Sequence, residues 1–207
     1  MSDPYTRSAP FYNPIVEPWL RPIKKKIVQE CLRLNLRSVL DVGCGTGTLV
    51  ELMRKEGIQA MGLDPSPGMI RVSRGNSWGP FFLVRGRGER LPFPSGTFQG
   101  LVYSMVLHEN SPIRRKEMLA EALRVLSPGG TLFILDYQKP STPLGHSARR
   151  IEYLVEWAVG GDHFRNYRQF MQEGALPAIL SHFPPDRVHW EPVFCGSMSL
   201  AKIFMQP

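Results

Sequence analysis

The chain has 207 residues, 43% of them hydrophobic, which is enough for one domain with a sizeable core. Its formal net charge of +7 would suit an acidic partner, but the basic residues are scattered and no aromatic residues interleave with their tightest run, 24–26. No apolar run is long enough to cross a membrane, and the three cysteines lack metal-ligand spacing. We therefore expect a cytoplasmic protein with no membrane span, no secretory leader and no metal site.

The N-terminal part combines an irregular segment with a helix. Residues 1–20 are rich in proline and aromatic residues, which predicts an irregular arm. From Ile23 to Leu34 apolar residues recur at helical spacing, and the basic run 24–26 is interpreted as a solvated face of that helix. Residues 1–36 should thus form an arm and a helix within a single domain spanning 1–207.

Short apolar segments then alternate with helical patterns at least four times. Such alternation is typical of an α/β fold with a doubly wound parallel sheet, which binds ligands at the carboxyl edge of its strands. Ser111 followed by a proline marks the start of one helix, and the run Pro128-Gly129-Gly130 is predicted to end it. The predicted strands cover residues 38–42, 59–64, 81–84, 98–103 and 131–135.

Residues 137–186 are more than one crossover connection requires. Ala148, Ile151, Leu154, Val155 and Ala158 would share one face of a helix, and shorter helices should follow at 164–172 and 177–182. We interpret this segment as a helical cap inserted over the sheet edge. The last residues, 188–190 and 197–204, resemble a hairpin.

Three alternating glycines follow the first strand. Gly43 permits a tight turn, Gly45 lets a ligand approach the backbone, and Gly47 opens the next helix. A dinucleotide-binding loop would need glycine or alanine at position 48, where this chain has Thr48. The pattern Asp-x-Gly-x-Gly-x-Gly from Asp41 instead matches a loop for S-adenosylmethionine, whose ammonium group the carboxylate could attract. A glycine turn without a ligand is the alternative.

Asp64 ends the second predicted strand, 23 residues after Asp41. A carboxylate at this position can accept hydrogen bonds from both hydroxyls of a ribose. The structural alternative is a cap for the helix that follows Pro65, and the two roles can coexist.

The chain resembles the class I S-adenosylmethionine-dependent methyltransferases. The segments Val39–Gly47, Gly62–Ser66, Gly88–Phe93, Tyr103–His108 and Leu123–Gly130 are similar to the successive motifs of that family. The likeness is to the type 11 branch, which includes the ubiquinone and menaquinone biosynthesis methyltransferases, and covers about residues 36–136. It implies a Rossmann-like sheet of seven strands, mostly parallel with an antiparallel C-terminal strand, and helices on both faces.

The resemblance also implies S-adenosylmethionine as cofactor and S-adenosylhomocysteine as product. The three glycines should line the methionine end, Asp64 should hold the ribose, and Pro65 and Met69 should lie against the adenine. The chain departs from the family at Arg87, where many relatives have an aspartate for the adenine amine. The implied cofactor-binding residues are Tyr12, Asp41, Gly43, Cys44, Gly45, Gly47, Asp64, Pro65, Met69, Arg87, Gly88, Glu89, Ser104 and Met105.

Methyl transfer from a sulfonium needs alignment and exclusion of water, and a general base only where the acceptor loses a proton. His108 and Glu109 follow the fourth strand, and Tyr137 follows the fifth, so these three are the candidate catalytic residues. Each of them could instead be a packing or loop-orienting residue. His146 and His163 are candidates for lining an acceptor pocket.

Three functions compete at this point. The first is methylation of a small, apolar or aromatic molecule. The second is methylation of nucleic acid, suggested by the net charge and by Arg71, Arg74, Arg85, Arg87 and Arg90, although no Asn/Asp-Pro-Pro-aromatic tetrad follows the fourth strand. The third is a non-catalytic binding module of the same fold. The sequence does not predict the oligomeric state.

Overall fold

A seven-stranded sheet forms the centre of the computed structural model, which describes residues 17–73 and 82–206. The strand order is β3-β2-β1-β4-β5-β7-β6. All neighbouring pairs are parallel except those of β7, which runs antiparallel to β5 and β6. The strands are β1 (Ser38–Val42), β2 (Gln59–Asp64), β3 (Leu83–Arg85), β4 (Phe98–Ser104), β5 (Leu126–Tyr137), β6 (Val188–Val193) and β7 (Met198–Phe204).

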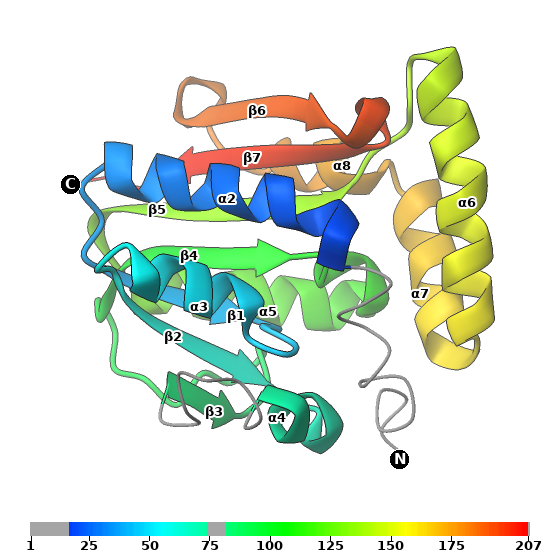
Figure 1. Cartoon of the computed structure of the whole chain (residues 1–207). Helices are drawn as coiled ribbons and strands as arrows, with labels where there is room; N and C mark the ends of the chain where they lie inside the picture. Colours follow the sequence, from blue (N-terminus) through cyan, green and yellow to red (C-terminus); the bar gives the residue numbers. More distant parts are fainter. Residues whose placement is uncertain (1–16, 74–81, 207) are drawn as a thin grey trace.

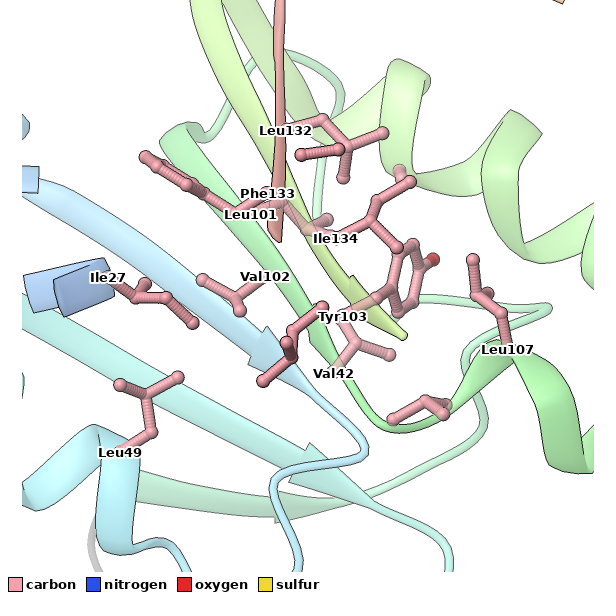
Figure 2. Close-up of a cluster of buried hydrophobic side chains, with 14 of the residues drawn as sticks. Ile27, Val42, Leu49, Leu101, Val102, Tyr103, Leu107, Leu132, Phe133 and Ile134 are labelled. Carbon is pink, nitrogen blue, oxygen red and sulfur yellow. The ribbon is translucent and has the colours of Figure 1, made fainter. Parts of the chain in front are cut away.

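The core is thickest around the central strands β1, β4 and β5, which are covered on both faces. Their apolar residues are buried almost without interruption, as expected for parallel strands between two layers of helices. Figure 2 shows Val102 and Val42 on these strands beside Ile27 and Leu49, which come from two helices. The strongly apolar strands therefore fix the centre of the sheet and the position of its carboxyl edge.

Helices lie on both sides of this sheet. Figure 1 shows α2 (Glu17–Arg33) and α3 (Thr48–Lys55) in front of it, and α5 (Pro112–Val125) and α8 (Ala175–Leu180) behind it. The other helices are α4 (Pro67–Ser73), α6 (Pro143–Val159) and α7 (Gly161–Gln172). The predicted start of α5 is confirmed, because the Ser111 side chain accepts a hydrogen bond from the backbone N–H of Arg114 and Pro112 occupies the first turn.

The order in which successive strands are added to the sheet reverses between the parallel neighbours β1 and β4. Strands β2 and β3 extend to one side of this point and β5 to the other, so the loops after β1 and β4 lie next to each other. Such a topological switch point is where open α/β sheets bind ligands. Figure 1 shows α6 and α7 standing at the edge where β4 and β5 end.

Two sequence-based interpretations are wrong. Pro128-Gly129-Gly130 does not end α5 as a turn, because the helix stops at Val125 and these residues belong to the first part of β5. The register between β4 and β5 shifts there, so the extra residues are absorbed as an irregularity of the strand. Lys24 is also not solvated: its side chain is buried against the next helix.

Helix α6 packs on the molecule with its polar face, whereas the sequence pattern predicts that its apolar face is buried. The predicted apolar face exists, but Ile151, Leu154 and Val155 are 66%, 61% and 48% exposed. The buried side chains include Glu152 and Glu156, which have hydrogen-bond partners on β5, α7 and the loop before β7. Specific polar contacts thus decide which face of α6 packs against the molecule.

Within the described ranges, no helix combines the length and apolar character needed to cross a membrane.

Candidate functional site

The glycine loop, residues 43–47, is held against β2 by its backbone. The N–H groups of Gly43 and Cys44 both donate to the carbonyl oxygen of Leu63, at 2.7 and 3.1 Å. Gly43 has φ +74°, and an added Cβ would lie 2.4 Å from a methyl of Val106. Gly45 has φ +56°, but a Cβ there would meet only the Met69 sulfur, at 4.0 Å. Gly43 is therefore required for packing, whereas Gly45 leaves open space.

Asp64 links this loop to the start of α4. One carboxylate oxygen accepts the N–H of Gly45 at 2.8 Å, and the other accepts the N–H of Ser66 at 2.8 Å. The cap of α4 is Ser66, whose hydroxyl accepts the N–H of Met69. Asp64 thus supports the loop without being the cap itself. An ionised carboxylate can accept about four hydrogen bonds, so this support is compatible with a ligand.

A pocket opens beside the loop and is lined by Lys24, Asp41, Gly43, Cys44, Gly45 and Ser104. Two of its polar atoms, Asp41 Oδ1 and Ser104 Oγ, are buried and have no hydrogen-bond partner among residues 17–73 and 82–206. Burial raises the pKa of Asp41 to about 7, with Asp64 and Glu17 adding to the rise and Lys24 opposing it. Unpaired buried polar atoms are costly, so these two indicate a place for a polar ligand.

Lys24 is a pocket residue that the sequence did not reveal. Its ammonium group donates to Glu17 at 2.7 Å and to the hydroxyl of Thr48 at 2.6 Å, at the start of α3. Buried lysines normally need such partners. Its spacing from the apolar residues of α2, one after Ile23 and three before Ile27, places it on the buried face and could have signalled this.

The residues predicted for adenine lie farther along the sheet edge. Met69 is buried beside the glycine loop, while Pro65 is exposed. Gly88 is packed tightly, because a Cβ there would lie 2.9 Å from Met118. Arg87 is largely exposed and its guanidinium is 3.6 Å from the carboxylate of Glu89. Tyr12, predicted to contact the cofactor, lies outside the described residues.

The segment after β4 connects the glycine loop with a second group of side chains. Met105 has φ +60°, a strained conformation for a residue with a side chain, and its N–H donates to the carbonyl oxygen of Leu135 on β5. Val106 then packs over Gly43. This path brings His108 to the buried end of β5, close to the loop.

His108 is fixed by Asp136, the next-to-last residue of β5. Its ring Nδ1 lies 2.8 Å from Asp136 Oδ1, and Asp136 Oδ2 accepts the N–H groups of Leu107 and His108. Asp136 Oδ2 thus holds the backbone of this turn, while Oδ1 orients the His108 ring. Asp136 is a site residue that no sequence pattern indicated, although it directly precedes the predicted Tyr137.

Glu156 of α6 contacts three of the predicted site residues, His108, Tyr137 and His163. Its Oε1 accepts the hydroxyl of Tyr137 at 2.7 Å and lies 3.6 Å from His108 Nε2, while its Oε2 contacts His163 Nε2. His163 Nδ1 is 3.1 Å from the carboxylate of Glu109. We call His108, Glu109, Asp136, Tyr137, Glu156 and His163 the polar cluster.

Opposite charges perturb the pKa values within this cluster. Burial alone would lower the pKa of His163, but the carboxylates of Glu109 and Glu156 outweigh it and raise the value to about 10. Burial would raise the pKa of Glu156, but His108 and His163 lower it to about 2. The pKa of His108 is raised by Asp136 and Glu156 against the effect of burial. Such perturbed groups gather at functional sites.

Aromatic rings enclose His108. Tyr137 lies 4.7 Å and Tyr167 6.2 Å from it between ring centroids, and Phe170 lies 6.4 Å away. Tyr167 and Phe170 of α7 are buried, so aromatic side chains of the cap segment surround this histidine. His146, the other histidine proposed for a pocket, is exposed in the first turns of α6.

Comparisons with known proteins agree with this geometry. A sequence model of a methyltransferase domain matches residues 40–134. An uncharacterized methyltransferase of Synechocystis sp. is 33% identical over 105 residues, which are 51% of this chain and 49% of that protein. The demethylmenaquinone methyltransferase of Thermotoga maritima is 28% identical over 200 residues, or 88% of this chain and 82% of that protein. The chain thus spans about half of one relative and most of the other.

The fold is shared with solved structures. An S-adenosylmethionine-dependent methyltransferase of Thermotoga maritima superposes with a TM-score of 0.67 at 18% identity, and the superposition covers 100% of both chains. The predicted Rossmann-like sheet with its antiparallel C-terminal strand is confirmed.

Proposed function

We propose that the chain is a class I S-adenosylmethionine-dependent methyltransferase and that it methylates a small-molecule acceptor at the carboxyl edge of the sheet. The cofactor of this family carries a methyl group on a sulfonium, which is already activated for displacement. The tasks left to the chain are to bind the cofactor, to align the acceptor with the methyl group and to exclude water.

The single observation that carries the proposal is the pair of unpaired buried oxygens beside the glycine loop. Asp41 Oδ1 and Ser104 Oγ line one pocket with Gly43 and Gly45. An ammonium group beside Asp41 would supply the missing partner and would favour the ionised carboxylate. These residues fit the methionine end of the cofactor, and Asp64 at the end of β2 fits the ribose.

We place the acceptor next to the polar cluster, under α6 and α7. His108 follows the segment that packs over Gly43, so the cluster lies beside the expected position of the methyl group. Tyr137, Tyr167 and Phe170 give this side an aromatic character. The Thermotoga maritima relative is named for demethylmenaquinone, and an aromatic acceptor suits such surroundings. His108, Glu109 and Tyr137 are the proposed catalytic residues, because all three belong to this cluster.

Calorimetric titration with S-adenosylhomocysteine tests the cofactor site. We expect saturable binding of one ligand per chain, and weaker binding by Gly45→Val, whose side chain would enter the open space beside the loop. The matched control is Gly96→Val, which changes another positive-φ glycine with no neighbouring atom, away from the pocket. Absence of binding by the wild-type chain would contradict the proposal.

The acceptor class is tested by following the labelled methyl group. Incubation with labelled S-adenosylmethionine and a panel of hydroxylated aromatic compounds, RNA and duplex DNA should label only small molecules. Label in nucleic acid, with binding that weakens as salt rises, would overturn the small-molecule proposal and would explain the net charge of +7 instead.

A further inference from the structure

Three side chains of the polar cluster bring metal-ligating atoms together. His108, Glu156 and His163 come from the segment after β4, from α6 and from α7, and each offers one atom so that all three atoms lie within 4.8 Å of one another. Both His108 and Glu156 are buried, and His163 is half-buried. The group is thus assembled from distant parts of the chain, away from bulk water.

Each histidine is oriented in the same way. His108 Nδ1 contacts Asp136 at 2.8 Å, and His163 Nδ1 contacts Glu109 at 3.1 Å. In both rings the other nitrogen, Nε2, faces Glu156. Histidines that bind metals commonly hold one ring nitrogen on a carboxylate and give the other to the ion. The cluster contains two copies of this arrangement around one further carboxylate.

We propose that His108 Nε2, His163 Nε2 and a carboxylate oxygen of Glu156 form a binding site for a divalent transition-metal ion, with Asp136 and Glu109 orienting the two histidines. Two nitrogens and one oxygen are the ligand set of many catalytic zinc sites, which keep a further position open. Imidazole and carboxylate ligands also suit iron, cobalt and nickel.

The spacing suits such an ion. Two ligand atoms about 2.1 Å from a tetrahedral ion lie roughly 3.4 Å apart. His108 Nε2 and Glu156 Oε1 are 3.6 Å apart, so an ion can bridge them with little movement. His163 Nε2 contacts Glu156 Oε2 directly, and that contact must open to admit the ion. Glu109, Asp136 and Glu156 supply three carboxylates, whose negative charge a divalent cation would offset.

The site also specifies the acceptor, a step that rests on the proposed function. The open position of the ion would take an oxygen donor, so the favoured acceptor is a hydroxyl compound. Its O–H proton would pass to water, the oxygen would form a bond to the methyl carbon, and the carbon–sulfur bond would break to leave neutral S-adenosylhomocysteine. A hydroxylated aromatic molecule meets both this requirement and the aromatic surroundings of His108.

The test is direct metal binding by the full chain, read out without turnover. Protein freed of metal by a chelator is titrated with Zn²⁺ by calorimetry and with Co²⁺ by visible absorption, and metal content is measured after dialysis. We expect one ion per chain, proton release on binding, and loss of the site in Glu156→Gln and His163→Ala. Asp136→Asn should weaken affinity by about tenfold to a hundredfold, because it removes only the orienting partner of His108.

The matched control is His182→Ala, which removes an exposed histidine outside the cluster and should leave metal binding unchanged. Titration with S-adenosylhomocysteine and circular dichroism establish that each variant is folded. If Glu156→Gln does not fold, His163→Gln provides the same test from the more exposed side. Wild-type protein that binds S-adenosylhomocysteine but takes up no stoichiometric ion would overturn the metal site and leave the proposed function standing. Equal metal binding by wild type and both ligand variants would also overturn it.

Discussion

The glycine loop and the polar cluster are neighbours at one edge of the sheet, but the loop depends on its backbone and the cluster depends on its side chains. The loop consists of consecutive residues, is held by backbone hydrogen bonds to Leu63, and works through the absence of side chains at Gly43 and Gly45. The cluster consists of buried and half-buried ionisable side chains from β5, α6, α7 and the segment after β4. The loop should therefore be sensitive to added atoms, and the cluster to removed ones.

The largest effect should come from one added carbon in the loop. Gly43→Ala would force alanine into a φ near +74°, which residues with a side chain disfavour, and would place its Cβ 2.4 Å from a methyl group of Val106. We expect a loss of about 2–5 kcal/mol in the free energy of unfolding, with loss of S-adenosylhomocysteine binding. Chemical denaturation and calorimetry measure the two quantities.

Gly57→Ala is the matched control for this substitution. Gly57 has φ +80°, but no atom lies within 4 Å of an added Cβ. Gly57→Ala should lower the free energy of unfolding by only the cost of holding alanine at a positive φ, about 1–2 kcal/mol, and should retain S-adenosylhomocysteine binding. Equal losses in the two variants would show that steric contact with Val106 does not distinguish the loop.

These features explain what the sequence could predict. Local patterns predict the glycine loop, Asp64 and the succession of strands along the chain, because a turn or a buried strand needs particular residues at adjacent positions. The expected cofactor-binding residues around the loop consequently lie along one edge of the sheet. Glu156 and His163 are seven residues apart on two helices, and only the fold brings them to His108.

Helix α6 shows why hydrophobic patterning misled the interpretation of the cap. The pattern correctly indicates a helix with one apolar face, but it does not state which face turns inward. Burial of Glu152 and Glu156 is offset by Ser197, Tyr137 and His163, which are contributed by other elements. The burial of Lys24 also depends on the fold, because its partner Thr48 on α3 is 24 residues away in the sequence.

The second prediction concerns the pH dependence of the loop side. Asp41 faces Lys24, Asp64 and Glu17, and its pKa in the folded chain is about 7, above the ordinary value of 3.8. A raised pKa means that this group's stabilisation is present below about pH 4 and is lost as the pH rises through 7. The loss is at most about 4 kcal/mol, since one pKa unit corresponds to about 1.4 kcal/mol.

The variant Asp41→Asn isolates this contribution. Free energies of unfolding of the ligand-free wild type should fall relative to the variant between pH 4 and 7. Affinity of the wild type for S-adenosylhomocysteine should rise over the same range, because the ligand's ammonium group favours the ionised carboxylate. Parallel stability profiles for wild type and variant would contradict this assignment.

The third prediction removes an atom from the cluster side. Tyr137→Phe deletes the hydroxyl that donates to Glu156 Oε1 at 2.7 Å. Because a buried carboxylate then loses a donor, we expect a loss of about 1–3 kcal/mol in the free energy of unfolding. Cofactor affinity should be unchanged, since the glycine loop is untouched. A large loss of S-adenosylhomocysteine binding would show that the two regions are coupled more strongly than their separate contacts suggest.

Ser104→Ala should have the opposite profile. The hydroxyl is buried and has no partner in the described part of the chain, so its removal should leave stability unchanged or slightly higher while weakening S-adenosylhomocysteine binding by about 1 kcal/mol. Ser199→Ala is the control, because its hydroxyl donates to the side chain of Gln138, the residue directly after β5. That variant should lose stability and keep cofactor affinity. Reversed outcomes for the two serines would mean that Ser104 does not face the ligand.

The smallest effect should come from the outward face of α6. Leu154 is 61% exposed, so Leu154→Ser removes little buried surface and should change the free energy of unfolding by less than about 0.5 kcal/mol. A core leucine such as Leu101, with no exposed surface, would cost about 2–5 kcal/mol when changed to alanine. Denaturation of both variants measures the contrast. A large cost at Leu154 would mean that this face is buried in solution and that α6 is held from both sides, by its polar contacts within the chain and by a covering surface on its apolar face.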